Sequence, residues 1–460
     1  MSDATITVRS PYDQRVVGEA PSCSAADVDR AVKEARHVLV SAPLAAWKRA
    51  EILDHAAHAL DDRREAFART IAAEAAKPLK TARVEAQRAV STFTFAAVEA
   101  RRLAGVMVPM DAAEGGQGKL AFTLRLPIGV VGGISPFNFP LNLVAHKVAP
   151  ALAAGCPLVL KPASQTPLSA LALRDLLVGE CGLPEPWLQV VTGPASEVGR
   201  ALVDHPEVAM ISFTGSAEVG WSIRQQAPRK KVGLELGNNS PVIIEADGDW
   251  STAATKIAVA GFSHAGQSCI STQRVYAHED VLDDFLGVLV AQVERLVVGD
   301  PLDENTDVSS LITPGDRDRV QAWIEEGVAA GAEVLCGNKV EGTLLWPTVL
   351  ANVKPDMKVS REEVFGPVVA VQGYRDTAEA LRLADDTRFG LQAAIFTRDI
   401  GTALQAAHSL HFGGVLVNEV PTWRADQMPY GGVRESGNTK EGPAWAVREM
   451  TEERLVVIQA

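Results

Sequence analysis

Short apolar runs that alternate with helix-length segments between residues 128 and 236 constrain the fold of this chain most strongly. Runs typical of buried strands lie at 128–134, 158–160, 188–191, 208–213 and 232–236. The segments between them, each long enough to cross one face of a sheet, lie at 142–154, 167–178, 195–203 and 217–226. Because strands that alternate with helices form a parallel sheet, the pattern predicts an α/β domain of the nucleotide-binding type.

The segments on either side of this domain predict further elements. From residue 25 to about 104 the chain is rich in Ala, Arg and Glu, with apolar residues three to four positions apart, which predicts successive amphipathic helices. A second set of alternating elements from 242 to about 417, followed by the glycine-rich turn at 431–432, predicts a second α/β domain. Apolar strands predicted at 120–126 and 454–458 each need a partner sheet edge.

The size and charge of the chain exclude several classes of function. With 460 residues it exceeds the ~100–200 residues typical of one domain. Its formal net charge of −13 repels polyphosphate backbones, and it has no run of about 18 apolar residues that could cross a bilayer. We therefore expect neither nucleic acid nor a membrane as a partner. The first 20 residues lack the pattern of a secretory signal, so we expect a cytoplasmic protein.

The five cysteines are scattered and never spaced as CxxC, so we expect neither a disulfide framework nor a metal site. A free cysteine is usually a small buried hydrophobe, and we read Cys156, Cys181 and Cys336 in that way. Cys269 differs because it follows Gly266-Gln267-Ser268. A glycine with small neighbours lets the backbone turn tightly and present one thiol in a cleft, although this signal alone is weak.

Cys269 gains weight from other motifs in the chain. In order these are P-F-N-F-P, K-P-A-S-Q-T-P, F-T-G-S, L-E-L-G, G-Q-S-C, E-E-V-F-G-P and P-Y-G-G. With them the chain resembles the NAD(P)-dependent aldehyde dehydrogenase superfamily over nearly its whole length. The wording G-Q-S-C-I-S and P-Y-G-G-V is most similar to the lactaldehyde-dehydrogenase-like branch.

The resemblance implies the aldehyde dehydrogenase fold, which consists of a Rossmann-like nucleotide-binding domain, an α/β catalytic domain and a small β oligomerisation extension. We expect the cofactor-binding domain at 1–108 and 128–239, and the catalytic domain at 240–440. The extension is expected at 109–127 and 441–460. Because the family pairs such strands between subunits, we expect a homodimer or homotetramer.

The chemistry of aldehyde oxidation requires a nucleophile, an oxyanion donor and a base. A thiolate at Cys269 attacks the aldehyde carbon, and the Asn138 amide together with the Cys269 backbone N–H stabilises the alkoxide. Glu235, between two strand-type leucines, is suited to take a proton from the water that hydrolyses the thioester. The resemblance adds Lys147 as a proton relay. The alternative, non-catalytic interpretation of Asn138 is a turn-capping amide, and that of Glu235 is a solvated or ion-paired carboxylate.

The cofactor site is expected where Phe213-Thr214-Gly215-Ser216 ends a strand and opens a helix, because helix N-termini bind pyrophosphate. The usual G-x-G-x-x-G motif is absent, so the detailed site rests on the resemblance. It implies that Lys161 binds the adenosine ribose, Glu363 binds the nicotinamide ribose and Phe365 packs near the nicotinamide. The other cofactor contacts expected from the motifs are Ile134, Ser135, Pro136, Phe137, Ala163, Ser164, Gly215, Ser216, Glu235 and Leu236.

Two positions depart from the family pattern. Many NAD-preferring members carry Glu where this chain has Ser164, and a carboxylate there would repel a 2′-phosphate. NADP is therefore expected to be accepted as well as NAD. Asn238 replaces a second glycine of the L-E-L-G-G pattern, a change whose consequence the sequence does not reveal.

The substrate pocket is expected, from the same motifs, to be lined by Phe139, Leu143, His146, Ser268, Ile270 and the Trp423-Arg424 segment. A cation at Arg424 favours an aldehyde that carries an anion or a hydroxyl group, whereas the alternative is a salt bridge at the rim. Succinic-semialdehyde enzymes of the superfamily usually have Arg at the positions of His146 and Ser263. We therefore expect succinic semialdehyde to be a poor candidate.

Two other functions remain open at the sequence level. A CoA-acylating semialdehyde dehydrogenase transfers its acyl group to a thiol and typically lacks a base at the position of Glu235. An inactive structural protein that only binds cofactor would be expected to have lost Cys269 or Asn138. The chain keeps all three residues, which favours hydrolysis to the acid.

Overall fold

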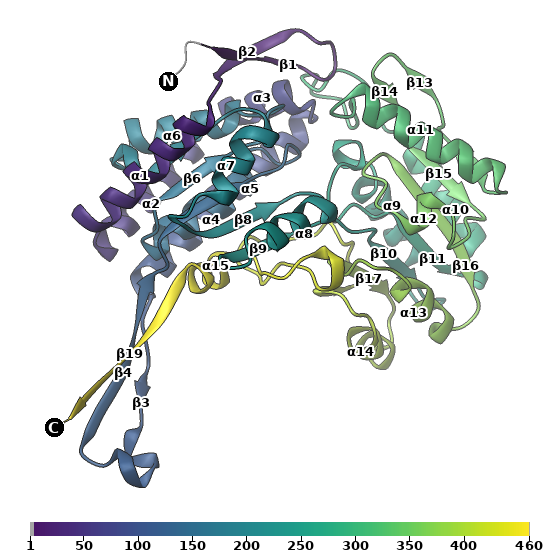
Figure 1. Ribbon diagram of the computed structural model, residues 1–460. Coiled ribbons are helices and arrows are strands. Elements are labelled where there is room, and N and C mark those ends of the chain that lie inside the picture. The colour runs from purple at the N-terminus through teal and green to yellow at the C-terminus, as the bar shows by residue number, and fades with distance from the viewer. Residues whose placement is uncertain (1–3, 460) are drawn as a thin grey trace.

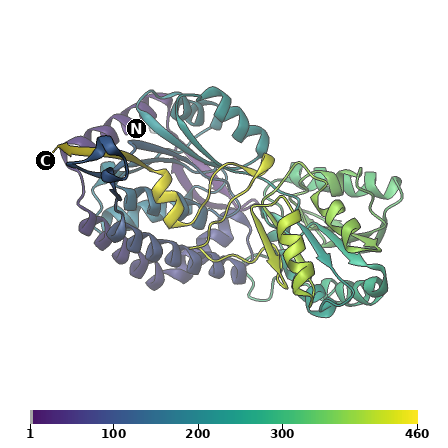
Figure 2. The ribbon, with the colours of Figure 1, turned by 90° about the horizontal axis from the view of Figure 1, so that it is seen from below.

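Two parallel sheets and a protruding arm organise the chain (Figure 1). The computed structural model describes residues 4–459. Two predictions involve residues outside this range. The first 20 residues, expected not to form a secretory signal, include residues 1–3, and the expected oligomerisation extension includes residue 460. Seen from below, the two sheets lie in separate lobes, and the C-terminal part of the chain crosses back from the second lobe to the first (Figure 2).

The first sheet holds five parallel strands in the order β7-β6-β5-β8-β9. Their bounds are β5 (Val130–Ile134), β6 (Leu158–Lys161), β7 (Leu188–Val190), β8 (Val208–Thr214) and β9 (Lys231–Glu235). The predicted parallel sheet is confirmed. The helices α5 (Asn142–Ala154), α6 (Leu168–Gly179) and α8 (Ala217–Gln226) also lie where the sequence predicts them. The helix predicted at 195–203 is instead a π-helical turn, Ala195–Gly199, followed by the short α7 (Arg200–Asp204).

Helices cover both faces of this sheet. On one face a single apolar core joins α5 and α6 to α2 (Ala46–Asp62), α3 (Arg64–Ala75) and α4 (Leu79–Arg102). On the other face α1 (Ala25–Ser41) packs with α7 and α8. A capping box between Ser24 and Asp27 starts α1, and Val28 and Val32 bury its apolar stripe. The amphipathic helices predicted between 25 and 104 are therefore confirmed.

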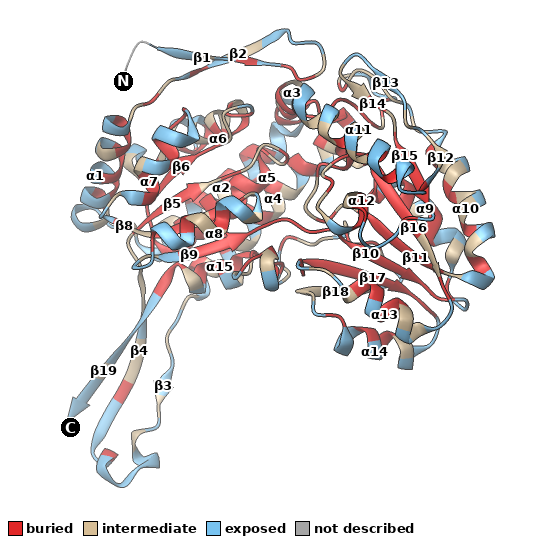
Figure 3. Ribbon diagram, turned by 45° about the vertical axis from the view of Figure 1, so that its right-hand side comes forward, coloured by how far each residue is buried: buried red, intermediate tan, exposed pale blue. Residues whose placement is uncertain are grey.

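The second sheet holds seven strands in the order β12-β15-β16-β11-β10-β17-β18, parallel except for β12. The strands are β10 (Pro241–Ile244), β11 (Arg274–His278), β12 (Glu333–Cys336), β15 (Thr348–Ala351), β16 (Val368–Tyr374), β17 (Gln392–Phe396) and β18 (Gly414–Val417). The helices around it are α9 (Trp250–Ala260), α10 (Glu279–Val293), α11 (Pro314–Ala329), α12 (Lys358–Arg361), α13 (Thr377–Asp385) and α14 (Ile400–Ser409). A small hairpin, β13 (Val340–Glu341) and β14 (Leu344–Leu345), lies at its edge. Buried strands and exposed outer helix faces are visible in both lobes (Figure 3).

The arm is a three-stranded antiparallel sheet that projects away from both lobes (Figure 3). It is formed by β3 (Met107–Val108), β4 (Lys119–Pro127) and β19 (Thr451–Gln459). The helix before β19, α15 (Pro443–Glu449), packs against α4 and α5, so the arm proper starts at Thr451. A separate hairpin, β1 (Thr5–Arg9) with β2 (Val16–Pro21), lies near the N-terminus. No helix within residues 4–459 has the length and apolar character to cross a membrane.

The strand order of the first sheet places a crevice at its centre. From β5 the chain adds β6 and β7 on one side, then returns to add β8 and β9 on the other side. Open α/β sheets bind ligands where the order reverses in this way, beyond the carboxyl ends of the strands. Here the reversal lies between β5 and β8, and the segments that follow are Ser135–Pro140 and Gly215–Ser216.

Candidate active site

A cavity of about 350 Å³ opens beyond the carboxyl ends of these strands and is closed by segments of the second lobe. We call it the reactive cavity. Predicted site residues that line it are Pro136, Phe137, Asn138, Leu143, Gly215, Ser216, Glu235, Leu236, Cys269, Glu363 and Phe365. Phe137 and Phe365 meet edge to face across the cavity, with ring centroids 5.8 Å apart. Residues from both lobes, far apart in sequence, therefore converge on one space.

The loop that presents Cys269 has an unusual backbone. His264, Ala265 and Gly266 have φ of 52°, 53° and 70°, in the left-handed region. Only glycine fits the last of these positions, because a Cβ on Gly266 would lie 2.0 Å from the carbonyl oxygen of Gly366. The glycine of the G-Q-S-C motif thus lets the loop press against the second lobe and turn Cys269 toward the cavity.

The thiol of the partly buried Cys269 has one hydrogen-bond partner among the described residues, the hydroxyl of Tyr430 at 3.0 Å. Burial raises the pKa of the Cys269 thiol to about 12, and the hydrogen bond with Tyr430 acts in the opposite direction. The carboxylate of Glu363 raises this pKa further, whereas Arg424 lowers it. The protein's own groups therefore favour the thiol at neutral pH.

The side chain of Asn138 is buried and fixed by the loop of the nucleophile. Its Nδ2 donates a hydrogen bond to the carbonyl of Gln267 over 2.9 Å, and its Oδ1 has no partner among the described residues. Gln267 is itself anchored, since its Oε1 accepts from the Ile312 N–H at 2.9 Å. An amide nitrogen carries two hydrogens, so one N–H of Asn138 fixes the side chain while the other stays available.

Glu235 ends β9 as a buried carboxylate, and neither of its oxygens has a hydrogen-bond partner within residues 4–459. Gly431 lies against it, since a Cβ added at Gly431 would lie 2.6 Å from Oε1 of Glu235. Burial raises the pKa of Glu235 well above its usual value, and repulsion from Glu441 adds to the effect. A buried acid without partners is costly to ionise, so it takes up protons readily.

Lys147, on α5, lies in the same buried region. Its Nζ donates to the hydroxyl of Thr214 at 2.7 Å and to that of Ser212 at 3.2 Å. Burial lowers the pKa of Lys147, and the charges of Glu441 and Glu235 oppose this shift. The two hydroxyls hold the amine below the cavity rather than inside it.

Glu363 and the L-E-L-G turn fit each other closely. A Cβ on Gly237 would lie 2.1 Å from the Glu363 carboxylate, and the N–H of Asn238 donates to that carboxylate at 3.0 Å. Burial raises the pKa of Glu363 to about 7. The structure also explains Asn238, whose Nδ2 donates to Ser240 Oγ at 2.8 Å and to the carbonyl of Gln392 at 3.1 Å. This side chain ties the turn to β17.

A second cavity, of about 690 Å³, lies beside the first and is suited to the remainder of a dinucleotide. It is lined by Ile134 and Lys161 at the ends of β5 and β6, by one side of α8 along its length, and by the 195–204 segment that includes α7. Burial lowers the pKa of Lys161. The two cavities flank the same strand ends, and α8 directs its N-terminal N–H groups between them, so the residues present fit NAD(P).

Three predicted cofactor residues line neither cavity: Ser135, Ala163 and Ser164. Ser164 Oγ donates to the carbonyl of Gly193 at 2.9 Å, so its hydroxyl serves the loop in this structure. No carboxylate stands at that position.

The predicted substrate residues are more dispersed than the predicted catalytic and cofactor residues, because only Leu143 among them lines the reactive cavity. Ser268 lines a small adjacent cavity of about 10 Å³ beneath Glu363. Ile270 packs with Cys269 and Tyr430 in a small apolar cluster. The Phe139 ring lies under the ammonium of buried Lys77, 3.6 Å from its centroid.

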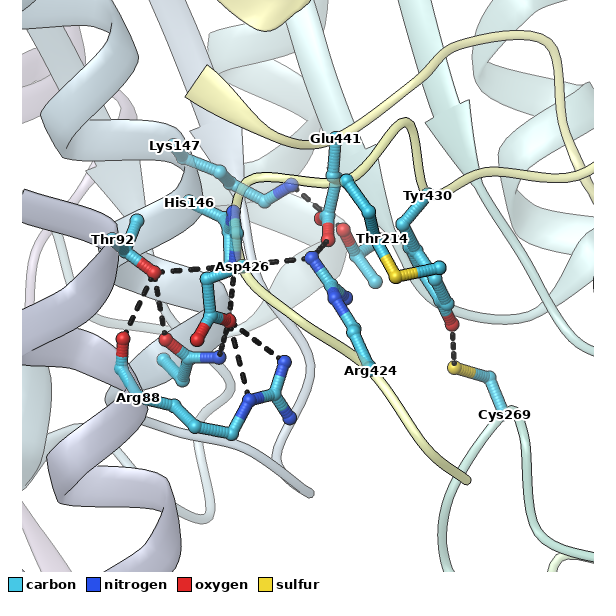
Figure 4. Close-up of polar contacts among 12 residues, drawn as sticks. Arg88, Thr92, His146, Lys147, Thr214, Cys269, Arg424, Asp426, Tyr430 and Glu441 are labelled. Atoms are coloured by element: carbon cyan, nitrogen blue, oxygen red, sulfur yellow. Dashed lines mark hydrogen bonds and ion pairs between the residues drawn. The ribbon is translucent and has the colours of Figure 1, made fainter. Parts of the chain in front are cut away.

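The other two predicted substrate residues, His146 and Arg424, belong to a buried set of charged side chains shown in Figure 4. We call Arg88, His146, Arg424, Asp426 and Glu441 the ion-pair cluster. Arg424 pairs with Glu441 at 2.8 Å, and its Nη2 lies 3.0 Å from His146 Nε2. Asp426 pairs with Arg88 at 2.8 Å and with His146 at 3.1 Å. Of the two interpretations of Arg424 left open by the sequence, this arrangement agrees with the salt bridge, although the pair is buried rather than at the rim.

Charge pairing sets the protonation of this cluster. Burial raises the pKa of Glu441, but attraction to Arg424 and the hydrogen bond from Arg424 outweigh this effect and leave the pKa below its usual value. Burial also lowers the pKa of His146, and the charge of Arg424 lowers it further. The cluster thus holds ionised carboxylates and arginines around a neutral imidazole.

The sequence analysis did not identify Tyr430, Asp426 or Glu441. Tyr430 lies in the P-Y-G-G motif, which was interpreted only as a glycine-rich turn and as a family motif. Asp426 and Glu441 lie in the segment between β18 and α15, which has little regular structure and no periodicity to mark a buried residue.

Comparison with known proteins identifies the family over nearly the whole chain. The model of the aldehyde dehydrogenase family matches residues 1–456. The chain belongs to the aldehyde dehydrogenase family. This aldehyde dehydrogenase is 44% identical over 451 residues to 3-sulfolactaldehyde dehydrogenase of Priestia aryabhattai, which covers 98% of the chain and 94% of the relative. It is 37% identical over 457 residues to lactaldehyde dehydrogenase of Methanococcus aeolicus, with 98% and 97% covered.

A solved structure extends the likeness to three dimensions. Glyceraldehyde-3-phosphate dehydrogenase from Methanocaldococcus jannaschii, complexed with NADP, superimposes with a TM-score of 0.95 at 35% identity, and 100% of each chain is covered. The predicted superfamily, its lactaldehyde-dehydrogenase-like branch and the aldehyde dehydrogenase fold are thereby confirmed. The aldehyde dehydrogenase oxidises an aldehyde to the carboxylic acid, with NAD(P) as hydride acceptor.

Proposed function

We propose that Cys269, Asn138 and Glu235 carry the reaction of this aldehyde dehydrogenase. The observation that supports this most is that all three line the reactive cavity, where Glu235 has no protein partner among the described residues. Buried polar groups normally have partners, so an unpartnered carboxylate beside a thiol is typical of a site that a reacting molecule completes.

The steps follow from these groups. The Cys269 thiolate attacks the aldehyde carbon, and the free N–H of Asn138 and the Cys269 backbone N–H stabilise the resulting alkoxide. When NAD(P) is bound it supplies the hydride acceptor, and loss of hydride from the alkoxide carbon leaves a thioester on Cys269. Glu235 then takes a proton from water, the oxygen attacks the thioester carbon, and the sulfur leaves as the carboxylic acid is released. Lys147 relays protons through Thr214, to which it is bonded.

The residues for the cofactor divide between the two cavities. We assign the adenosine half to the cavity that Ile134 and Lys161 line, and the nicotinamide half to the reactive cavity. Glu363 and Phe365 lie in the latter, in reach of a ribose and a nicotinamide ring. Because Ser164 carries no charge, we propose that both NAD and NADP are accepted.

The substrate is a small aldehyde that carries a hydroxyl or an anionic group. Support comes from the relatives whose names specify 3-sulfolactaldehyde, lactaldehyde and glyceraldehyde 3-phosphate. Within this chain, we propose Arg88 as a cation that can meet such an anion, because Asp426 engages only its Nε and Nη2 and its side chain is 20% exposed. Arg424 contributes less, since Glu441 already pairs with it.

A product assay tests this proposal. The protein is incubated with propanal, lactaldehyde and 3-sulfolactaldehyde, each with NAD and with NADP, and the products are separated by chromatography. We expect the free acid in every productive reaction, with a higher kcat/KM for the two substituted aldehydes than for propanal. Formation of acyl-CoA only when CoA is added, without free acid, would contradict the role of Glu235.

We also propose an oligomer and a reducing compartment. The outer strand β19 exposes Leu455, Val457 and Ile458, each at least 46% exposed, which is typical of an edge that pairs with another copy. A homodimer or homotetramer is expected by light scattering, whereas a monomer would contradict it. All five cysteines are free, in agreement with a cytoplasmic protein.

A further inference from the structure

The hydroxyl of Tyr430 lies in a position to act on the nucleophile. It is 3.0 Å from Cys269 Sγ, which is its hydrogen-bond partner in the described part of the chain. The tyrosine is 3% exposed, and its ring packs against Ile270 and Leu391. Neither solvent nor a rotation of the ring readily takes the hydroxyl away from the sulfur.

A cation lies on the face of the same ring. The guanidinium carbon of Arg424 is 3.8 Å from the ring centroid of Tyr430. Arg424 Nη2 donates to Glu441 at 2.8 Å and lies 3.0 Å from His146 Nε2 (Figure 4). A cation over an aromatic face withdraws electron density from the ring. The phenol O–H is then a stronger hydrogen-bond donor than that of an isolated tyrosine.

The direction of the Tyr430–Cys269 hydrogen bond follows from the acidities of the two groups. Burial raises the pKa of Tyr430 well above its usual value, so the phenol keeps its proton when Cys269 ionises. The thiolate has no hydrogen to give and must accept. The other charged groups that act on Cys269 are Glu363 and Glu441, which oppose its ionisation, and Arg424, which favours it.

We propose that Tyr430 is a further catalytic residue, which donates a hydrogen bond to the Cys269 thiolate and holds it toward the cavity, while Arg424 is a positioning residue that strengthens the donor. This inference rests on Cys269 being the nucleophile proposed above. It gives the ion-pair cluster a chemical role, since the cluster fixes Arg424 on the ring.

Alkylation of Cys269 tests the proposal without any need for turnover. The full-length protein is treated with iodoacetamide between pH 6 and 10, and alkylation of the Cys269 peptide is followed by mass spectrometry. Iodoacetamide reacts with the thiolate, so the rate against pH reports its stability. In Tyr430→Phe the ring and its contact with Arg424 remain but the donor is lost, so we expect the rate at pH 8 to fall about tenfold and the profile to move to higher pH.

Tyr374→Phe is the matched control. It also removes a buried phenol hydroxyl, which bonds to the Ile244 carbonyl at 3.0 Å in the second sheet, and its alkylation profile should match that of the original protein. An unchanged or faster rate in Tyr430→Phe would overturn the proposal, because it would mean that the hydroxyl only accepts from the thiol.

Replacement of Tyr430 by 3-fluorotyrosine keeps the test decisive if Tyr430→Phe fails to fold. Fluorine makes the phenol more acidic at nearly unchanged shape, so alkylation should become about two- to threefold faster. A rate equal to or lower than that of the original protein would contradict the donor role. The activity of Cys269→Ala separates a failure of the Tyr430 proposal from a failure of the proposed function. If that variant still turns over, Cys269 is not the nucleophile, whatever the alkylation profile shows.

Discussion

The reactive cavity and the ion-pair cluster both contain buried polar side chains, but they differ in whether those side chains have partners. Glu235 and Glu441 make the contrast clear, since both are buried carboxylates and the charge of Glu441 raises the pKa of Glu235. Glu235 has no hydrogen-bond partner within residues 4–459, whereas Glu441 is paired with Arg424 at 2.8 Å. Partner groups stabilise the fold, and their absence leaves a group available to a reacting molecule.

The comparison implies that substitutions in the cavity act mainly on activity, and that substitutions in the cluster act mainly on stability. The predictions below test this division, from the largest expected effect to the smallest.

Cys269→Ala is expected to reduce aldehyde oxidation about 10⁴-fold or more, because no covalent intermediate forms without the sulfur. The rate of NAD(P)H formation measures this, and the melting temperature should stay nearly the same. Cys336→Ala is the matched control, since that thiol lies on β12, at the outer edge of the second sheet. Near-normal turnover by Cys269→Ala would contradict the claim that the reaction takes place in the reactive cavity.

Glu441→Gln is expected to destabilise the protein by about 3–5 kcal/mol, because it leaves the buried Arg424 without its carboxylate. Denaturant unfolding followed by circular dichroism measures the change. The double variant Arg424→Met with Glu441→Gln removes both charges and should recover most of the lost stability. If the single substitution leaves the unfolding midpoint unchanged, the cluster does not stabilise the fold.

Glu235→Gln should have the opposite sign and stabilise the protein at neutral pH by about 1–3 kcal/mol, because a buried unpartnered carboxylate is replaced by a neutral amide. The pKa of Glu235 is raised in the folded state. Its contribution to the free energy of unfolding is therefore fully present below its unfolded pKa near 4.5, and is lost as pH rises through the folded pKa. Unfolding free energy measured from pH 5 to 9 should therefore fall less steeply in the variant. A destabilised Glu235→Gln protein would mean that the carboxylate has a structural partner.

Ser164→Glu has the smallest expected effect. A carboxylate at this position repels a 2′-phosphate, so the KM for NADP should rise about tenfold while that for NAD changes little. Steady-state kinetics with both cofactors measure the ratio, and Ser164→Gln serves as the uncharged control of the same size. Equal changes for NAD and NADP would place the 2′-phosphate away from residue 164.

The sequence predicts the first lobe well because its strands are continuous apolar runs, buried on both faces, and its long helices have one apolar stripe. Cys269, Asn138 and Glu235 were also predictable, since each lies in a motif with a chemical reason for its residue types. The helix at 195–203 was mispredicted because its first turn is a π-helix, which no periodicity distinguishes from an α-helix.

The substrate side was harder to predict for a physical reason. The sequence leaves open whether Arg424 is a free cation or part of a salt bridge, because its pairing depends on Glu441 and on the path of an irregular segment that crosses between the lobes (Figure 2). Likewise, the contact between Tyr430 and Cys269 joins residues 161 positions apart. Contacts of this kind depend on tertiary packing and leave no local pattern.

A single-turnover experiment on Glu235→Gln tests the central claim most directly. The variant is mixed rapidly with aldehyde and NADP, and reduced cofactor is followed while the quenched protein is digested for mass spectrometry. The account predicts a burst of about one reduced cofactor per active site, followed by a slow phase at least about 10²-fold below the normal rate, with the acyl group on the Cys269 peptide. Steady turnover at the original rate, or an acyl group on any other residue, would contradict it.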